Sequence, residues 1–463
     1  MRVDPSIRLR DLNSRLDRCI ELARSKITSI SETWDPCRGA PVYTVGGKYA
    51  TRGWTEWTQG FQYGCAILLF DALGEKQFLE IGRRGAVDRM APHVTHTGVH
   101  DHGFNNISTY GNLRRLMLEG AIPVDSWEQR FYELALKASG AVQGARWTTI
   151  RDGKGYIPSF NGAHSLFSDT IRTCRSLGLA HGLGHVLMVE NDRAISLFDR
   201  MIEHAETTAR YNVYYGDGRD AYDVRGRVAH ESIFNVQDGN YRCPSTQQGY
   251  SPFSTWTRGL AWIVTGYSEL LEFLEVVDDE DLAGCGGRGH VTAFMTRAAT
   301  AAADYYVAGA SAADGIPYWD TGAPGLTQMG DYLGRAADPF NEFEPVDSSA
   351  AAIAAQGLYR LGRYLGGTAG RSYTRAALTV ARTLFDAPYL SDDENHQGLI
   401  LHSVYHRPNG WDRRREGQNV PNGESSMWGD YHALELAVLL KREITGQPYL
   451  TFFSGKPEGS DVG

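Results

Sequence analysis

The arrangement of this chain is decided by the stretch Thr246-Gln247-Gln248-Gly249-Tyr250-Ser251-Pro252-Phe253-Ser254-Thr255-Trp256-Thr257-Arg258-Gly259-Leu260-Ala261-Trp262. It opens with amides, hydroxyls and a turn, and it then passes into an amphipathic run that predicts a helix. Aromatic rings, amides and a guanidinium at a helix entrance suit a flat anionic ligand such as a uronic sugar, because a guanidinium binds a carboxylate in a fork. The alternative is a simple helix start, with Trp256 and Trp262 in the core and Arg258 on the surface.

The composition favours a folded protein with a large core and excludes some classes of partner. The 463 residues are 42% hydrophobic and 22% charged, which argues against disorder. A net charge of −9 without a basic stripe argues against nucleic-acid binding. An anionic substrate is still compatible, since a site can be locally positive in an acidic protein. The 10 Trp and 24 Tyr supply flat surfaces of the kind that carbohydrate-handling proteins use.

Cysteine usage and the N-terminal residues predict a cytoplasmic protein. The six cysteines are scattered, without a C-x-x-C pair, which is typical neither of a zinc site nor of a dense disulfide framework. The first residues contain no apolar segment of a secretory signal, and no run reaches transmembrane length. We therefore expect reduced thiols and no membrane association. The sequence gives no indication of the oligomeric state.

Apolar residues recur at helical spacing along most of the chain. The spacing predicts helices over 6–29, 55–73, 76–90, 165–178, 180–189, 192–209, 226–237, 256–275, 289–307, 347–365, 371–386 and 430–443. Strand-like alternation is rare and short, and no low-complexity linker splits the chain. We expect one all-α domain, residues 1–463, with two concentric helical layers and with function on the loops at one end.

Asp101 is the first candidate acid–base group. It lies between His100 and His102, in a loop just before a predicted helix. One interpretation is that its carboxylate caps that helix. The other is that its neighbours tune its pKa for catalysis.

Asp169 is the second candidate, inside the predicted helix 165–178. If the helix is exposed there, Asp169 pairs with Arg172 three residues later. The neighbouring Leu166, Phe167 and Ile171 indicate a buried helix instead. Burial would raise the pKa of Asp169 and make it a proton donor.

Other constellations point to structure more than to chemistry. His181 and His185 are four residues apart, but the glutamate of a zinc-protease H-E-x-x-H motif and a third ligand are missing, so we expect no metal. Asp347 precedes Ser-Ser-Ala-Ala and is expected to cap the following helix. No nucleophile elbow, phosphate loop or dinucleotide fingerprint is present.

Seven segments, taken in order, resemble those of a known enzyme family. They are His100-Asp101-His102-Gly103-Phe104, Ser168-Asp169-Thr170-Ile171, Gln248-Gly249-Tyr250, Thr255-Trp256-Thr257-Arg258-Gly259-Leu260-Ala261-Trp262, Pro317-Tyr318-Trp319-Asp320, Asp347-Ser348-Ser349-Ala350-Ala351 and Gly429-Asp430-Tyr431. The family is that of the unsaturated glucuronyl hydrolases, glycoside hydrolase family 88, related to the unsaturated rhamnogalacturonyl hydrolases of family 105. The matches span about residues 55–443, and their order and number make the resemblance specific.

The resemblance implies an (α/α)6 barrel and a hydration reaction. The substrate would be an oligosaccharide that ends in a 4,5-unsaturated uronic acid, the product of a polysaccharide lyase. The enzyme would hydrate the C4=C5 bond, and the hemiacetal that results would open and release the sugar. Such a reaction needs one proton donor and a positioned water, and it requires no metal or organic cofactor.

By position, the resemblance also implies roles for single residues. Asp169 would be the general acid/base that protonates C4 and activates water for C5, and Asp101 would be its supporting carboxylate. The residues expected to line the sugar and its carboxylate are His100, His230, Gln248, Trp256, Arg258 and Trp262.

Three alternatives remain open at this point. A glucuronidase could cleave saturated uronides directly with Asp101 and Asp169, whose separation would set the stereochemistry. A polysaccharide lyase would need a Tyr or His base and a neutralised substrate carboxylate, and His102, Asn105, His164 and Tyr250 could be recruited for these roles. A non-catalytic oligosaccharide-binding protein would keep Trp256 and Arg258 and tolerate the loss of Asp169.

Overall fold

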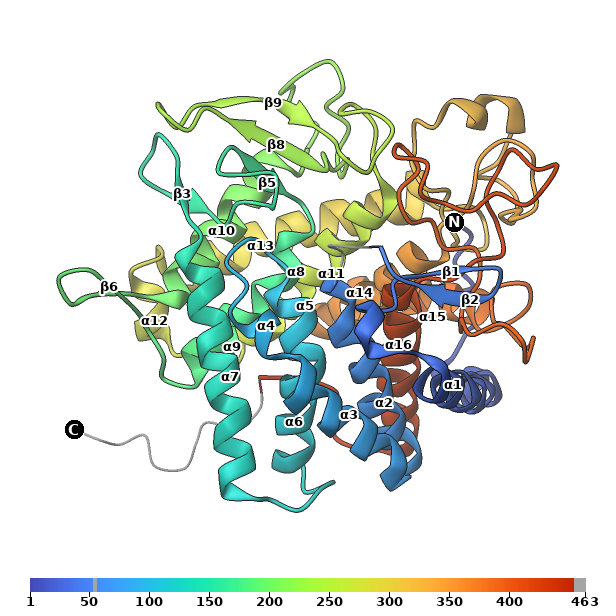
Figure 1. The fold of residues 1–463 in the computed structure, drawn as a ribbon. Coiled ribbons are helices and arrows are strands. Elements are labelled where there is room, and N and C mark those ends of the chain that lie inside the picture. Colours follow the sequence, from blue (N-terminus) through green and yellow to red (C-terminus); the bar gives the residue numbers. More distant parts are fainter. Residues whose placement is uncertain (53–55, 454–463) are drawn as a thin grey trace.

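A computed structural model describes residues 1–52 and 56–453 of the chain, and helices dominate this part (Figure 1). The helices are α1 (Asn13–Thr33), α2 (Gln59–Leu73), α3 (Lys76–Arg89), α4 (Ala91–Val94), α5 (His102–Asn106), α6 (Asn112–Leu118), α7 (Ser126–Ala145), α8 (Thr170–Thr173), α9 (Arg175–Gly182), α10 (Leu197–Tyr211), α11 (Thr257–Leu274), α12 (Asp279–Ala283), α13 (Gly287–Tyr305), α14 (Ser348–Leu365), α15 (Gly367–Leu384) and α16 (Met427–Thr445). A π-helical stretch, Ile107–Gly111, joins α5 to α6.

Short antiparallel strands are confined to the connections between helices. They are β1 (Tyr43–Val45), β2 (Lys48–Ala50), β3 (Thr148–Thr149), β4 (Gly155–Tyr156), β5 (Ser165–Phe167), β6 (Leu187–Val189), β7 (Arg193–Ile195), β8 (Glu231–Phe234) and β9 (Tyr241–Ser245). Three of them form one sheet in the order β5-β8-β9, and the others pair as hairpins. The β5-β8-β9 sheet lies above the helical body, at the end where the long loops gather (Figure 1).

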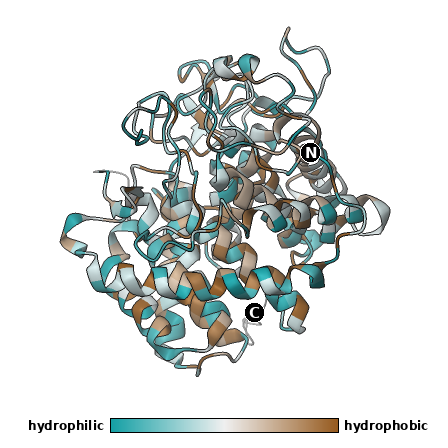
Figure 2. Ribbon diagram, turned by 90° about the vertical axis from the view of Figure 1, so that its right-hand side faces the viewer, coloured by the Kyte–Doolittle hydropathy of each residue, from teal (hydrophilic) through white to brown (hydrophobic). Residues whose placement is uncertain are grey.

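Among the described residues the helices form two concentric layers. The inner layer consists of α2, α5–α6, α8–α9, α11, α14 and α16, and the outer layer of α1, α3, α7, α10, α13 and α15. All 18 residues of α11 are buried, whereas outer helices such as α10 bury one face. Hydrophobic and hydrophilic residues alternate along the helices accordingly (Figure 2). The prediction of an all-α (α/α)6 barrel is confirmed.

The prediction is wrong around Asp169, where strands replace expected helix. Of the predicted helix 165–178, the first residues form β5, which pairs with β8, and only then do α8 and α9 follow. The predicted helix 226–237 is β8 itself. A short apolar run such as Leu166-Phe167 fits a buried strand as well as a buried helix, so periodicity alone does not separate the two.

The prediction of a helix over 180–189 is also wrong, because α9 ends at Gly182, Gly184 takes a left-handed φ of +74° and residues 187–189 form β6. The remaining predicted helices are present, with shifted ends. The helix predicted over 6–29 begins at Asn13, after a 3-10 turn. Residue 55, the first of the predicted helix 55–73, lies outside the described residues. Asp347 caps α14 as expected, by accepting the N–H groups of Ser349 and Ala350.

Close backbone contact brings the two candidate aspartates to the same end of the barrel. Asp101 immediately precedes α5 and Asp169 immediately precedes α8. The two helices meet at Gly103, where a Cβ atom would lie 2.2 Å from the carbonyl oxygen of Thr173. Glycine is therefore required at this crossing. No helix in the described residues combines the length and apolarity needed to span a membrane.

A buried ionic cluster ties the inner helices together below that end. The Arg172 guanidinium, fully buried on α8, bonds both carboxylate oxygens of Glu269 on α11, with Nη2 3.0 Å from Oε1. The same Nη2 lies 3.2 Å from Glu435 on α16 and 3.3 Å from Gln356 on α14. Its Nη1 lies 2.8 Å from His432. One side chain thus links four inner helical segments.

Replacing Arg172 by Met is expected to destabilise the fold by about 3–5 kcal/mol, because Glu435 and Glu269 each lose a buried ion pair with it. The measurement is urea unfolding of the purified protein. A matched control is Arg210→Met, which breaks an exposed 2.8 Å pair with Asp152 and is expected to cost less than about 1 kcal/mol. Equal effects of the two substitutions would contradict the proposed importance of the cluster.

Candidate active site

A pocket lies at the end of the barrel where the inner helices begin. Its empty volume, counted to its open mouth, is about 560 Å³. The lining residues are Trp57, His100, Asp101, Phe104, Phe160, Asp169, Gln247, Gln248, Trp256, Arg258, Trp262, Tyr405, His406 and Trp411. Of the eight residues predicted to form a site, only His230 is absent from this wall, and its ring packs against Trp256 of the wall at 4.7 Å between ring centroids, tilted by 60°.

His100 lies between the two aspartates and couples them. Its Nε2 is 3.5 Å from Oδ1 of Asp169 and 3.8 Å from Oδ1 of Asp101. All three side chains are buried, and the ring of His100 stacks on Phe160 and meets Phe167 edge-on. Asp101 makes no capping hydrogen bond to α5, so the capping interpretation of this residue is wrong. Its carboxylate faces the pocket instead.

The two carboxyl groups have opposite pKa shifts. Burial raises the pKa of Asp101, and the charge of Asp169 adds to that effect against the pull of His100. Burial would also raise the pKa of Asp169, but the attraction of the His100 ring, 3.5 Å away, outweighs burial and holds that pKa below its ordinary value. Burial would lower the pKa of His100, yet the two aspartates raise it overall. The expectation of a raised pKa at Asp169 is therefore wrong in this structure, where the pKa of its neighbours His100 and Asp101 is raised instead.

His230 is fixed as a neutral hydrogen-bond donor. Its Nδ1 accepts the backbone N–H groups of Gln247 and Gln248, at 3.0 and 3.3 Å. Burial lowers the pKa of His230 to about 4. The proton therefore sits on Nε2, which is buried and has no hydrogen-bond partner among the described residues. An unsatisfied buried N–H is costly, and a bound ligand or water would relieve it.

Arg258 is held differently from the prediction. Its Nη1 donates to Asp347 Oδ2 at 3.1 Å and to the carbonyl of Val404. Its Nη2 donates to Gln248 Oε1 and to the carbonyl of Tyr405, both at 2.9 Å. Both terminal nitrogens are thus engaged inside the protein, and the expectation that they grip a substrate carboxylate in a fork is not met. The guanidinium instead fixes the amide of Gln248 and the 404–405 backbone.

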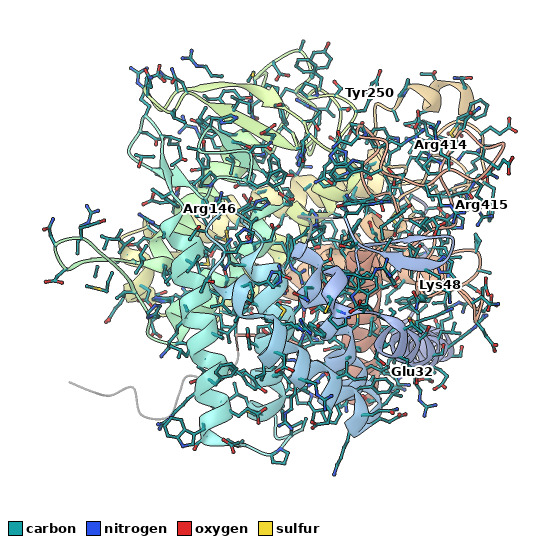
Figure 3. All side chains as sticks on the ribbon, viewed as in Figure 1. Glu32, Lys48, Arg146, Tyr250, Arg414 and Arg415 are labelled. Carbon is teal, nitrogen blue, oxygen red and sulfur yellow. The ribbon has the colours of Figure 1, made fainter. Side chains whose placement is uncertain are left out.

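Sequence reasoning missed the part of the wall that comes from the long loop 387–429. Tyr405, His406 and Trp411 lie there, and Trp411 packs on the rings of the other two. Asp412 holds this segment by accepting the N–H groups of Tyr405 and His406. The only available signal was the aromatic content of an otherwise polar loop. Tyr250, by contrast, stands exposed at the loop end of the molecule (Figure 3).

The residues proposed for other chemistries do not gather in the pocket. His102 is bonded to Ser139 and to the carbonyl of His96, and Asn105 accepts the N–H of Gly60. His164 is exposed and does not line the pocket. His181 lies 3.2 Å from Asp281 on the surface. The described part of the chain contains no cluster of three or more His, Cys, Asp or Glu side chains that could hold a metal ion.

Replacing Asp169 by Asn is expected to lower the pKa of both Asp101 and His100, because each is raised in part by the charge of Asp169. Carbon-13 and nitrogen-15 NMR titration of the two side chains would measure this. A control, Asp152→Asn, changes an exposed carboxyl that pairs with Arg210 outside the site and should shift neither. A rise in the pKa of Asp101 would contradict the coupling.

The known proteins to which the chain is similar are named as hydrolases of unsaturated sugars. No protein-family model matches the chain. An unsaturated glucuronyl hydrolase of Bacillus sp. (strain GL1) is 25% identical over 414 residues, which cover 87% of this chain and 90% of that protein. An unsaturated chondroitin disaccharide hydrolase of Streptococcus agalactiae is 21% identical, over 83% of this chain and 81% of that protein.

Solved structures share the fold at low sequence identity. A crystal structure of an unsaturated glucuronyl hydrolase specific for heparin superposes with a TM-score of 0.71 at 21% identity, covering 94% of this chain and 98% of that one. The structure of the Bacillus sp. GL1 enzyme gives 0.67 at 22% identity, covering 93% and 98%. These likenesses agree with the ordered motifs around the pocket, and they support the resemblance of the chain to the unsaturated glucuronyl hydrolases, which are glycoside hydrolases.

Proposed function

We propose that this protein releases a terminal 4,5-unsaturated uronic acid from lyase-generated oligosaccharides by hydrating the C4=C5 bond. The observation that carries the proposal is the Asp101–His100–Asp169 group on the wall of a pocket of aromatic rings and amides. The relatives named above bear on the substrate class, and one solved relative holds the unsaturated disaccharide dGlcA-GalNAc6S. We further propose that residues 1–463 act as one catalytic domain.

Asp169 is the proposed general acid/base. His100, whose pKa is raised, supplies the proton that Asp169 lacks in the free pocket. Asp169 passes that proton to C4 and takes one from the water that attacks C5, so the group ends with the same number of protons. The hemiketal formed at C5 opens, and collapse of the hemiacetal left at C1 releases the next sugar.

An incoming uronate carboxylate would drive this proton transfer. It adds a negative charge beside two buried aspartates, which raises the proton affinity of both. The pKa of Asp101 is already raised by burial, and this carboxyl lies 3.8 Å from His100. The order of events is then binding first and protonation of Asp169 second.

Several neutral donors and helix ends support binding of an anionic sugar. Helices α11, α14 and α16 begin around this end of the barrel, and their N-terminal dipoles favour negative charge. The Nε2–H of His230 is without a partner among the described residues, and the amide of Gln248 is oriented by Arg258. Trp256 and Trp262 offer ring faces for the sugar. Arg258 acts in this proposal by positioning Gln248.

The proposal is tested by the ultraviolet absorbance of unsaturated disaccharides incubated with the protein, because hydration destroys the conjugated C4=C5 chromophore. We expect loss of absorbance, reduced about 10²–10⁴-fold in kcat/KM by Asp169→Asn, with binding retained in calorimetry. The surface variant Asp152→Asn should keep full activity.

Each other outcome points elsewhere. No loss with either glucuronyl or galacturonyl substrates would overturn hydration and favour direct cleavage of saturated uronides. A rise in absorbance with an intact polysaccharide would indicate a lyase. Unchanged turnover in Asp169→Asn would remove Asp169 from the mechanism.

A further inference from the structure

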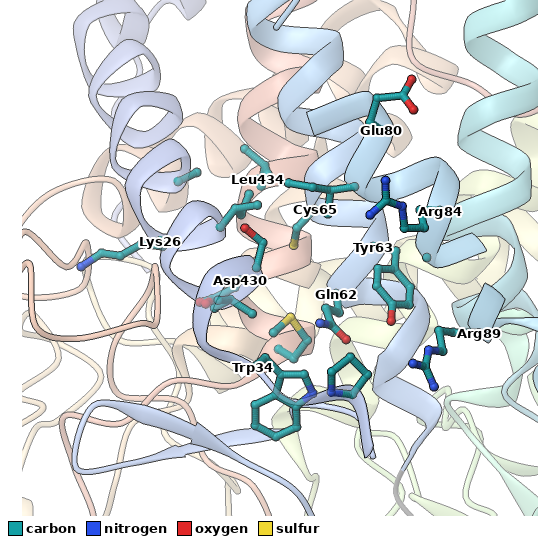
Figure 4. A pocket seen from close by; sticks show the side chains of 18 of the residues that line it. Lys26, Trp34, Gln62, Tyr63, Cys65, Glu80, Arg84, Arg89, Asp430 and Leu434 are labelled. Carbon is teal, nitrogen blue, oxygen red and sulfur yellow. The ribbon is translucent and has the colours of Figure 1, made fainter. Parts of the chain in front are cut away.

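A second and larger pocket lies on the side of the barrel, between the outer helices α1 and α3 (Figure 4). Its empty volume is about 1280 Å³, and its floor is formed by residues of the inner helices α2 and α16. No residue of the candidate active site lines it. This volume includes the open mouth of the pocket, and the mixed apolar and polar lining is that of a small-molecule site.

The walls combine an apolar interior with a basic rim. Ile27, Ile30 and Leu434 lie inside, and Trp34 and Tyr63 add ring faces. At the rim, α3 contributes two arginines that make no ion pair or side-chain hydrogen bond with the described residues, namely Arg84 and Arg89.

Other polar groups at the pocket are accounted for, with one exception. Glu80 is paired with Arg83 at 3.5 Å, and Asp88 also lines the pocket, so the two rim arginines face one carboxylate that makes no ion pair with the described residues. Lys26 donates to the carbonyls of Asp393 and His396. The exception is Gln62, whose Oε1 is buried without a hydrogen-bond partner among the described residues. A buried acceptor of this kind is satisfied by a ligand that carries a donor.

We propose that this pocket binds a small organic anion with a ring-bearing apolar body. The body would lie between Trp34 and Tyr63, the anionic group would pair with Arg84 and Arg89, and an N–H or O–H group would donate to Gln62. Charge complementarity at the rim selects an anion over a neutral or cationic molecule of the same shape.

The pocket also touches the anchor of a wall of the candidate active site. Asp430, on its floor, accepts hydrogen bonds at 2.6–3.0 Å from Tyr49 Oη, the backbone N–H groups of Leu399 and Ile400, and Ser425 Oγ. Six residues after Leu399 the same segment places Tyr405 and His406 in the active pocket.

Occupancy of the side pocket is therefore coupled to the order of the 399–406 segment. The coupling rests on the proposed function only because it treats the pocket at the end of the barrel as catalytic. Binding of an anion in the side pocket does not depend on the proposed function. Lys26 and Asp430 both hold the backbone of the chain from 391 to 406, Lys26 at residues 393 and 396 and Asp430 at residues 399 and 400. A ligand that packs on these two side chains restrains this part of the chain. We expect that restraint to be visible in the backbone even without turnover.

The probe for binding is 8-anilinonaphthalene-1-sulfonate, an aromatic anion whose fluorescence rises in apolar sites. We expect saturable binding to the full-length protein, weakened about tenfold in the double variant Arg84→Gln/Arg89→Gln. Ser31→Trp, at the pocket wall on α1, should abolish it. The matched control is Glu32→Trp, the next residue of α1, which does not line the pocket (Figure 3).

A second readout separates this site from the proposed activity. On binding of the dye, hydrogen exchange of the 399–406 amides should slow in the native protein and in Glu32→Trp but not in Ser31→Trp. Dye binding that survives Ser31→Trp, or equal binding of the neutral dye Nile red with no effect of the arginine substitutions, would overturn the proposal. Binding without any change in exchange would overturn the coupling. None of these results depends on whether unsaturated sugars are hydrated.

Discussion

The Arg172 guanidinium at the centre of the barrel is the constraint on which the site depends. A fully buried cation is tolerated only when its charge is balanced and its donors are bonded, and here Glu269 and Glu435 supply the balance. Because these partners sit on α11 and α16, the register of α8 against both helices is fixed. Asp169 lies three residues before Arg172, so the same cluster also fixes the height at which its carboxylate meets the pocket.

This arrangement explains which parts of the fold could be predicted from the sequence. Long helices with regular apolar spacing, such as α11 and α14, are present close to their predicted bounds, because burial of a whole face leaves a clear period. The segment before Arg172 gave no such signal. Ser165-Leu166-Phe167 is too short to show a period, and its strand partner, β8, lies more than sixty residues later in the chain. Pairing at that distance is a tertiary effect that local propensity does not contain.

The residues of the candidate site also differ in how far their positions could be predicted from the sequence. Asp101, Asp169 and Trp256 each stand immediately before an inner helix, so a barrel places them at one end once the helices are recognised. The state of Arg258 could not be predicted in this way. Its partners include the carbonyls of Val404 and Tyr405, which are backbone groups and leave no mark in the sequence. Arg258, which the sequence suggests as a substrate ligand, lines the pocket but donates in the folded chain to the backbone of the 387–429 loop.

The engagement of Arg258 changes how an anionic substrate is accommodated. If a free guanidinium neutralised the sugar carboxylate, binding would leave the charge beside Asp101 and Asp169 unchanged. With Arg258 already balanced by Asp347, the added negative charge is felt by the Asp101–His100–Asp169 group, and it raises the proton affinity of that group. We infer that the internal hydrogen bonds of Arg258 make substrate binding the event that protonates Asp169. The lowered pKa of Asp169 then agrees with its proposed role as an acid, because the charge of the bound sugar raises it.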